Sequence, residues 1–515
     1  LWLLLLRHAD ISVNLPVIAY YIKKHSYWKN KHVSGPQPIP FLGNFAKIMT
    51  TQESVTLFSK KLYDQYPNEQ AVGIYSGGSP MLVLRDPDLI KDVLIKNFGY
   101  FSDRGTRVTN EPLSDNLFNA EVESWRKLRQ GFTPMFSSGK LKSMSPLIQT
   151  CVDEFQTYVD KLADENVPQE MRSLMSKYTL EVIGSCAFGL KLGALSLTQE
   201  ENVFREIAET IFKPRLKSTI WRGINVIIPG IIRFLNVTIT NSAITSFFQD
   251  LVRKVVQERE GKHSNRKDFM DLLIEMRNRS TLNEASEDKD PLALKVTNNV
   301  MAAQALVFYA AGFETSSASM SFLLYELALN QECQEKVYKD INDAIKKHGH
   351  INYDSVCEMN YLEMAFDEVL RKHPPGGVLI RKCVEDYSFA NSNLKIDKGV
   401  RVLIPVFAIH HDSKFYKDPE EFIPERFSNE NKRNIIPCTF LPFGDGPRNC
   451  IGMRFAKVES MMGLAGFLHK YKVEPSAKTK VPLEYDTTSL TIKSKDGIWL
   501  NIIRRFCFNI VYLIL

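Results

Sequence analysis

Hydrophobic residues repeat with a helical period over long stretches of the chain, and they follow a strand-like pattern only over short ones. The helical period is clearest over residues 145–162 and 292–329. Strand-like stretches occupy residues 80–84 and 400–405. The pattern predicts a mostly α protein with a small β part (α+β). The polar stretch from Asn278 to Pro291 is expected to form a surface loop.

The chain has 515 residues, but no flexible linker or change of composition divides its main part. We therefore expect one large domain over residues 45–503. Residues 1–34 hold two apolar runs, which charged residues interrupt and lysines follow, and residues 35–44 are rich in proline. These features predict an incomplete N-terminal membrane anchor with a basic flank, then a stiff hinge, with the domain facing the cytosol. The alternative is an irregular leader on a soluble protein.

Two further segments are unusually apolar for a soluble domain, residues 224–239 and the atypical tail at residues 504–515. Either segment could contact a membrane. The alternatives are core packing for the first segment and a faulty end of the sequence for the second, and for the tail we favour the fault.

Composition narrows the class of protein. Hydrophobic residues make up 44% and charged residues 24% of the chain, which are ordinary globular proportions. The net charge of +6 comes from scattered lysines and arginines, so nucleic acid is not an expected partner. The eight cysteines include no CxxC pair, which argues against a zinc site or a disulfide lattice and favours a reducing compartment.

The candidate chemistry begins with residues 443–452, which read FGDGPRNCIG. A metal-binding cysteine must ionise, and its pKa falls near backbone amides, a helix N-terminus or a guanidinium. Gly444 and Gly446 permit a tight turn, and residues 453–468 are expected to form the helix that follows Cys450. The segment is therefore a candidate thiolate ligand loop. The alternative is a buried free cysteine in a turn.

This segment matches the FxxGxRxCxG signature, and on it the chain resembles the cytochromes P450. The resemblance implies the P450 fold and a single large haem-binding domain, with Cys450 as the axial ligand of the iron of haem b. Within the loop it further implies that Arg448 reaches a haem propionate and that Phe443 shields the sulfur from water. The other haem-contacting residues that it implies are Gly446 and Gly452 of the loop, Trp125 and Arg129 of a WxxxR sequence, and Arg381.

A second constellation is the ExxR sequence of Glu368 and Arg371, which places both charges on one face of a helix. Such a pair is usually a solvated surface pair. Here it precedes Cys450 by about eighty residues in the order that P450s show. The resemblance adds Arg426 of a PERF sequence as the third member of a buried structural network.

The third constellation is AGFETSS at residues 311–317, within an apolar helix. Cleaving the bond of dioxygen consumes two protons, which a hydroxyl and a carboxylate can deliver. Thr315 and Glu314 are therefore the candidate catalytic residues, and both match the AGxET helix of the P450s. The alternative for Thr315 is a hydrogen bond to its own helix.

The substrate pocket is expected to be apolar. Spacing places four residues of this helix on one face, and the resemblance supplies three other wall residues. Core packing is the alternative for each of them. The expected pocket residues are Phe308, Ala311 and Gly312 on the helix face beside Thr315, with Phe118, Val378 and Leu379 from elsewhere in the chain.

The resemblance is closest to insect microsomal family-six type enzymes, through residues 101–105 (FSDRG), 112–119 (PLSDNLFN) and 135–142 (MFSSGKLK). It implies a monooxygenase of the endoplasmic reticulum membrane that inserts one atom of O2 into small apolar substrates, such as xenobiotics, plant toxins, insecticides or endogenous lipids and hormones. Electrons would come from NADPH through a flavoprotein reductase, with cytochrome b5 as a further candidate partner. A basic face of Arg126, Lys127 and Lys457 is a candidate docking site.

Two other functions are compatible with a haem-thiolate site. An isomerase or dehydratase rearranges a peroxide without a reductase, but such enzymes usually lose the acid and alcohol that Glu314 and Thr315 provide. A non-catalytic haem protein needs the cysteine but not the oxygen-activating helix. The sequence favours the monooxygenase.

Overall fold

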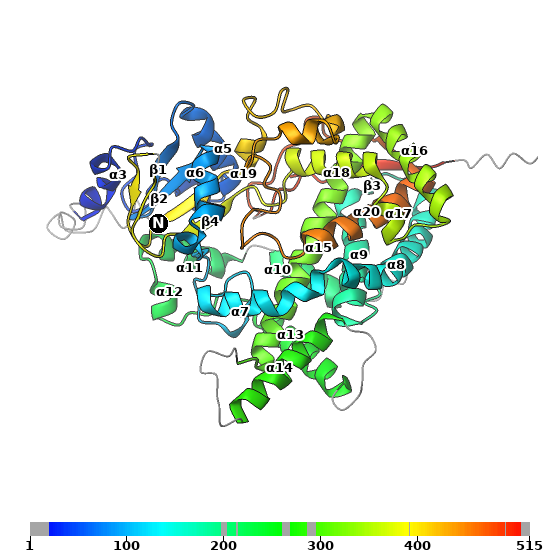
Figure 1. Cartoon of the computed structure of the whole chain (residues 1–515), viewed down its shortest axis with the longest axis horizontal. Helices are drawn as coiled ribbons and strands as arrows, with labels where there is room; N and C mark the ends of the chain where they lie inside the picture. Colours follow the sequence, from blue (N-terminus) through cyan, green and yellow to red (C-terminus); the bar gives the residue numbers. More distant parts are fainter. Residues whose placement is uncertain are drawn as a thin grey trace, which may run out of the picture.

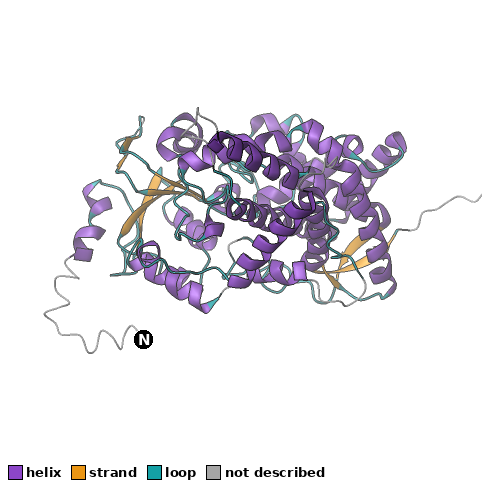
Figure 2. Cartoon of the chain, turned by 90° about the horizontal axis from the view of Figure 1, so that it is seen from below, coloured by secondary structure: helices purple, strands orange, loops and turns teal. Residues whose placement is uncertain are grey.

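The computed structural model describes residues 20–196, 203–212, 215–259, 268–285, 295–390, 392–489 and 491–505. Its architecture is helical, with two groups of strands at opposite ends of the molecule (Figure 1, Figure 2). The longer helices are α5 (Val55–Gln65), α7 (Val122–Phe132), α8 (Ser138–Asp164), α9 (Met171–Ile183), α10 (Val203–Phe212), α11 (Leu216–Ile227), α13 (Ser242–Arg259), α14 (Phe269–Ala285), α15 (Asn298–Leu329), α16 (Gln331–His348), α18 (Asn360–Lys372) and α20 (Met453–Lys470). The short helices are α3 (Tyr27–Asn30), α4 (Ala46–Met49), α6 (Pro87–Lys91), α12 (Ile231–Phe234), α17 (Tyr353–Val356) and α19 (Val406–His410).

The larger sheet has the strand order β1-β2-β7-β4 and lies beside the first helices of the chain (Figure 1). Its strands are β1 (Ala71–Ser76), β2 (Ser79–Leu84), β7 (Arg401–Ile404) and β4 (Leu379–Lys382). Strand β7 runs parallel to β2 and antiparallel to β4, where Arg381 pairs with Val402. Because alternate residues of a strand share a face, Leu379 and Arg381 lie on the same side of β4. The sheet thereby fixes two of the predicted site residues.

The two smaller sheets hold the remaining strands. Strands β3 (Gln169–Glu170), β9 (Trp499–Arg504) and β8 (Tyr471–Pro475) form a three-stranded sheet at the other end of the molecule. Strands β5 (Tyr387–Ser388) and β6 (Lys395–Ile396) form a separate antiparallel pair.

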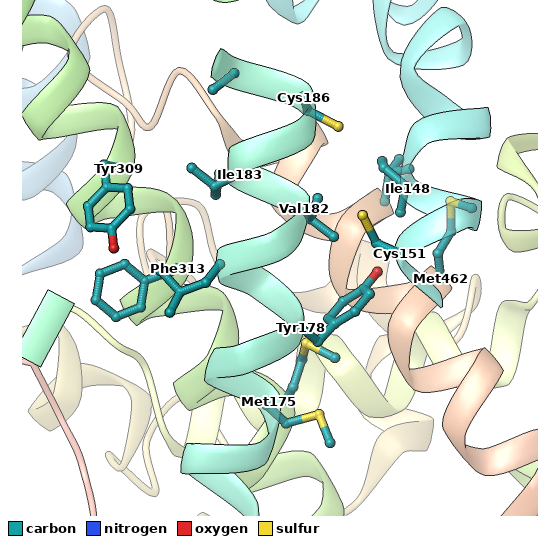
Figure 3. Packing of buried hydrophobic residues seen from close by; sticks show 14 of the residues in the cluster. Ile148, Cys151, Met175, Tyr178, Val182, Ile183, Cys186, Tyr309, Phe313 and Met462 are labelled. Carbon is teal, nitrogen blue, oxygen red and sulfur yellow. The ribbon is translucent and has the colours of Figure 1, made fainter. Parts of the chain in front are cut away.

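Helix α15 runs through the middle of the helical part, and α9 packs closely along it (Figure 1, Figure 3). Figure 3 shows α9 with α15 on one side and α8 and α20 on the other. Ile183 of α9 faces Tyr309 and Phe313 of α15. At Gly312 a Cβ atom would overlap the side chain of Ile183. A glycine at this position therefore lets α9 approach α15 closely, and the apolar contacts between the two helices belong to the largest core cluster, which also includes residues of α8, α13 and α20.

The pattern-based predictions can be compared with these elements. The predicted helical segment 145–162 lies within α8, and α15 covers residues 298–329 of the predicted segment 292–329. The predicted strand 80–84 lies within β2, and β7 covers residues 401–404 of the predicted strand 400–405. The predicted loop at 278–291 is wrong for its first part, because α14 continues to Ala285. An ion pair between Arg279 and Glu275, one helical turn apart, supports that continuation. Residues 286–294 lie outside the described residues.

Of the predicted anchor segment (residues 1–34) and the predicted tail (residues 504–515), residues 1–19 and 506–515 lie outside the described residues. The described part of the anchor segment includes α3, and β9 ends at Arg504 within the tail. Among the helices that the structure describes, none combines the length and apolarity needed to cross a bilayer. The apolar segment 224–239 lies mostly at the surface, where it forms the end of α11 and the short α12, although Ile232 of α12 is buried. Phe234 of α12 is 84% exposed.

Candidate haem-thiolate site

The loop that carries Cys450 is a strained turn held by backbone contacts. Gly444 and Gly446 have φ values of 69° and 70°. Residues other than glycine rarely adopt this backbone conformation. At Gly446 a Cβ atom would also overlap the carbonyl oxygen of Leu94. The amide of Cys450 donates to the carbonyl of Phe443 at 2.8 Å, which closes the turn just before α20 begins at Met453. The glycines of the motif therefore fix where the sulfur lies.

Many protein atoms surround Cys450, but its side chain is still accessible to solvent. Burial raises the pKa of this thiol. The backbone N–H of Gly452 and the charges of Arg129 and Arg104 lower the pKa, but less than burial raises it. A thiolate here needs a further positive charge, which a bound metal ion supplies.

Four arginines from distant parts of the chain gather near this loop: Arg104, Arg129, Arg381 and Arg448. Burial lowers the pKa of each, to about 10 for Arg104 and to about 9 for Arg381 and Arg448. For Arg448 and Arg381, repulsion by neighbouring arginines contributes to this lowering of the pKa after burial, which is the largest cause. A bound anion would offset the repulsion and the cost of burial in such a cluster.

The arginines also present hydrogen-bond donors that need acceptors. Within the described residues, Nε and Nη1 of Arg448 and Nε of Arg381 are buried without an acceptor. Arg448 is held in place by Ala120, whose carbonyl accepts from Nη2 at 3.1 Å, and by the ring of Trp125, 4.2 Å from its guanidinium. Fixed, unsatisfied guanidinium N–H groups suit carboxylates such as the propionates of haem. The residues present therefore fit haem b beside Cys450.

Arg129 of α7 and Arg104, which precedes α7 in the chain, both donate hydrogen bonds to the same loop. Arg129 donates to the backbone and side-chain oxygens of Asn449 at 2.7 and 2.6 Å. Arg104 donates to the carbonyl of Arg448 at 2.9 Å. Sequence reasoning missed Arg104 as a site residue. It stands in the FSDRG segment, which carried only the family resemblance and no chemical role.

The candidate catalytic pair lies in the middle of α15. Both carboxylate oxygens of Glu314 accept from Nη2 of Arg172 at 2.5 Å, and the hydroxyl of Thr491 donates to Oε1 at 3.2 Å. The hydroxyl of Thr315 donates to the carbonyl of Ala311 at 2.8 Å, which is the back-bonded geometry that sequence reasoning had weighed as the alternative. Its lone pairs remain free to accept a proton donor. No sequence signal pointed to Arg172 or Thr491.

Glu368, Arg371 and Arg426 form a buried network rather than a surface pair. Nε and Nη2 of Arg371 donate to the two oxygens of Glu368, both at 2.8 Å, and Nε of Arg426 reaches Oε1 at 3.3 Å. Glu368 and Arg371 are fully buried. Arg371 also donates to the carbonyl of His410 at 2.8 Å, which ties α18 to α19.

The expected pocket residues occupy varied surroundings. Ala311 is exposed and Phe308 half-buried on α15, where the ring of Phe308 lies 4.1 Å from that of Phe269. Phe118 is 49% exposed, with Arg104 4.4 Å above its ring. Leu379 begins β4 and Val378 directly precedes it, and both are partly buried. Gly312, predicted as a pocket residue, also packs against Ile183 of α9. The substrate pocket itself stays a prediction.

Comparisons with known proteins give the class that this fold and site define. The family model "Cytochrome P450" matches residues 33–501. The chain is 39% identical to cytochrome P450 6B1 of Papilio polyxenes over 94% of the chain and 97% of that protein. It is 38% identical to cytochrome P450 6B2 of Helicoverpa armigera over 96% and 98% of the two chains. It is 39% identical to the probable cytochrome P450 6a20 of Drosophila melanogaster over 95% and 97%.

The chain is therefore a haem-thiolate oxidoreductase, and it belongs to the cytochrome P450 family. Like other members, it is a monooxygenase that uses haem b and takes electrons from NADPH through a reductase. This confirms the predicted fold class, family and cofactor. It also decides against the isomerase and the non-catalytic haem protein as readings of the site.

Proposed function

We propose that this enzyme inserts one oxygen atom into small apolar molecules, such as xenobiotics, plant toxins, insecticides or endogenous lipids and hormones, with Thr315 and Glu314 delivering the protons. One observation carries the proposal. Although α15 is buried over most of its length, Ala311 is exposed and Leu306 to Phe308 and Thr315 are partly accessible in its middle. An accessible, mostly apolar strip at the centre of a protein suits an apolar ligand.

In this scheme the bound haem supplies oxygen activation, and electron donation from the Cys450 thiolate promotes it. The chain's own residues would hold the haem and deliver the protons. The buried arginines, with Trp125, hold the propionates, and Gly444 and Gly446 fix the position of the sulfur. Ala311 neighbours both Glu314 and Thr315 on the helix, at spacings of three and four residues, so a proton on either group can reach the accessible strip. Arg172 fixes the position of the Glu314 carboxylate.

The proposal includes the endoplasmic reticulum membrane, with the catalytic domain on the cytosolic side. The surface segment with Phe234 lies near the described start of the chain, where the hydroxyl of Tyr21 donates to the carbonyl of Ile227 at 3.1 Å. Several large apolar side chains are exposed there, including Tyr20, Ile22 and Leu235. Apolar side chains from both segments could enter one membrane surface beside the predicted anchor.

The reductase, and cytochrome b5 if it participates, would dock on the side of Cys450 away from the substrate. Of the three cations expected there, Lys457 is already paired with Asp367 at 2.7 Å and Glu363 at 3.0 Å. Arg126 is exposed and pairs with Glu123 at 3.2 Å. Arg126 and Lys127 therefore carry more of the proposed docking surface than Lys457.

The experiment uses the full chain reconstituted with reductase and a panel of apolar substrates. The reduced carbon monoxide complex should show the thiolate-type Soret band, and Cys450→Ser should abolish it. Thr315→Val should keep haem content and substrate binding, while product per NADPH falls and peroxide rises. Ser321→Ala is the matched control, because Ser321 lies six residues after Thr315 and its buried hydroxyl donates to the carbonyl of Ala318 in its own helix. Unchanged coupling in Thr315→Val would contradict the proposed role of Thr315.

A further inference from the structure

The surroundings of Glu314 contain one group that can exchange a proton with it. Within the described residues, the side-chain donors to its carboxylate are Arg172 and Thr491. A guanidinium does not give up its proton in a protein, so Arg172 can hold Glu314 but cannot reload it. A hydroxyl both donates and accepts, and Thr491 therefore can.

Thr491 continues to a second hydroxyl. Oγ of Ser489 lies 3.3 Å from Oγ1 of Thr491. A threonine hydroxyl has one hydrogen, and that of Thr491 points to Glu314. Ser489 must then donate to Thr491, so the two hydrogen bonds run in one direction, from Ser489 through Thr491 to Glu314.

The outer end of this chain faces solvent. Ser489 and Thr491 line a small surface pocket together with Ser54, Thr56 and Asp486. Asp486 accepts from the amide and hydroxyl of Thr488 at 2.8 Å, and its pKa is lowered despite partial burial. An ionised carboxylate beside polar hydroxyls keeps water at the mouth of such a pocket.

We propose that Ser489 and Thr491 form a proton wire that reloads Glu314 from this pocket during each catalytic cycle. The inference rests on the proposed role of Glu314 as a proton donor. In each transfer, one proton leaves Glu314 for the reaction. Thr491 then gives its hydroxyl proton to Glu314 and takes one from Ser489, and Ser489 takes one from water at the pocket. Each hydroxyl gains as many protons as it loses, so the net result is one proton moved from solvent.

The decisive variant is Ser489→Ala, because Ser489 does not touch Glu314. If Thr491 merely positions the carboxylate, removing the Ser489 hydroxyl should have no effect. If the wire operates, the rate of product formation should fall by about 10- to 100-fold. Loss of a proton-transfer group usually costs about 100-fold or more, but water can partly replace the Ser489 hydroxyl. The solvent deuterium isotope effect on product formation should rise in the same variant.

Thr491 provides the complementary pair. Thr491→Val should show the same defect, and Thr491→Ser, which keeps the hydroxyl, should restore coupling. Thr487→Val is the matched control from the same loop, because its hydroxyl donates to the carbonyl of Thr51 at 3.0 Å and not toward Glu314. It should behave like the parent.

An infrared measurement reports on the contact without turnover. The carboxylate bands of Glu314, assigned by their loss in Glu314→Gln, should shift in Thr491→Val and stay in place in Ser489→Ala. Haem content and the carbon monoxide spectrum should match the parent in every variant of the loop. Parent-like coupling and isotope effect in Ser489→Ala would overturn the wire. Absence of product from the parent itself would instead overturn the proposed function.

Discussion

Replacing Glu368 by alanine tests whether the ExxR pair stabilises the core or is only a solvated pair on the surface of a helix. The change leaves Arg371 fully buried after loss of two hydrogen bonds of 2.8 Å, and it also removes the acceptor of the Ile423 amide at 3.0 Å and of Arg426. Breaking a buried ion pair by removing one partner costs about 3–5 kcal/mol. Since a domain is stable by only about 5–15 kcal/mol, little haem-loaded protein should accumulate.

The chain offers a matched control with the same spacing. Glu123 and Arg126 are also separated by three residues on a helix, but their side chains are 76% and 55% exposed. An exposed pair contributes about 0.2–1 kcal/mol, so Glu123→Ala should leave stability almost unchanged. The two variants therefore differ in burial and in the contacts that burial adds, not in the chemistry of the pair.

Urea unfolding followed by tryptophan fluorescence and Soret absorbance provides the measurement. Midpoints are compared, because a tightly bound cofactor breaks the two-state assumption behind an extrapolated free energy. With a slope of about 3 kcal/mol per molar urea, Glu368→Ala should lower the midpoint by about 1 M or more. Equal midpoints and equal haem content for Glu368→Ala and Glu123→Ala would refute the assignment of Glu368 to a stabilising network.

Three other predictions concern the loop, the arginines and the topology. Gly444→Ala should cost about 1–2 kcal/mol through its positive φ alone, whereas Gly446→Ala, whose Cβ would also meet the Leu94 carbonyl, should yield protein without haem, as pyridine haemochrome content would show. Arg104→Leu should release haem to apomyoglobin faster than the parent, and the exposed Arg126→Leu should not; equal rates would remove Arg104 from the propionate cluster. In cells the sequon at Asn236 should stay unglycosylated, because the proposed orientation places the domain in the cytosol, and a glycan found there by mass spectrometry would reverse that orientation.

The sequence by itself determined what depends on neighbouring residues. The thiolate loop lies within ten consecutive residues, and its glycines, cysteine and following helix act over one or two turns. The helical period of α8 and α15 likewise follows from local spacing. The residues of the haem loop could therefore be named from the sequence. The end of α14 could not, because its polar residues favour a loop by composition while an ion pair along the helix supports the helix.

Only the tertiary structure decided which distant groups meet. Arg104, Arg129 and Arg381 come from three separate segments away from the loop of Arg448, and each of the three alone reads as a solvated surface charge. Packing buries them together, and burial and repulsion lower the pKa of Arg448 to about 9.

The surroundings of Glu314 show the same division between sequence and structure. The acid itself could be named from its helix, but its partners Arg172 and Thr491 stand 142 and 177 residues away along the chain. No local pattern specifies such contacts, because the free energy that makes them comes from burying whole elements against one another. The close approach of α9 to α15 and the return of the C-terminal segment beside α15 decide that Arg172 and Thr491 both donate to Glu314.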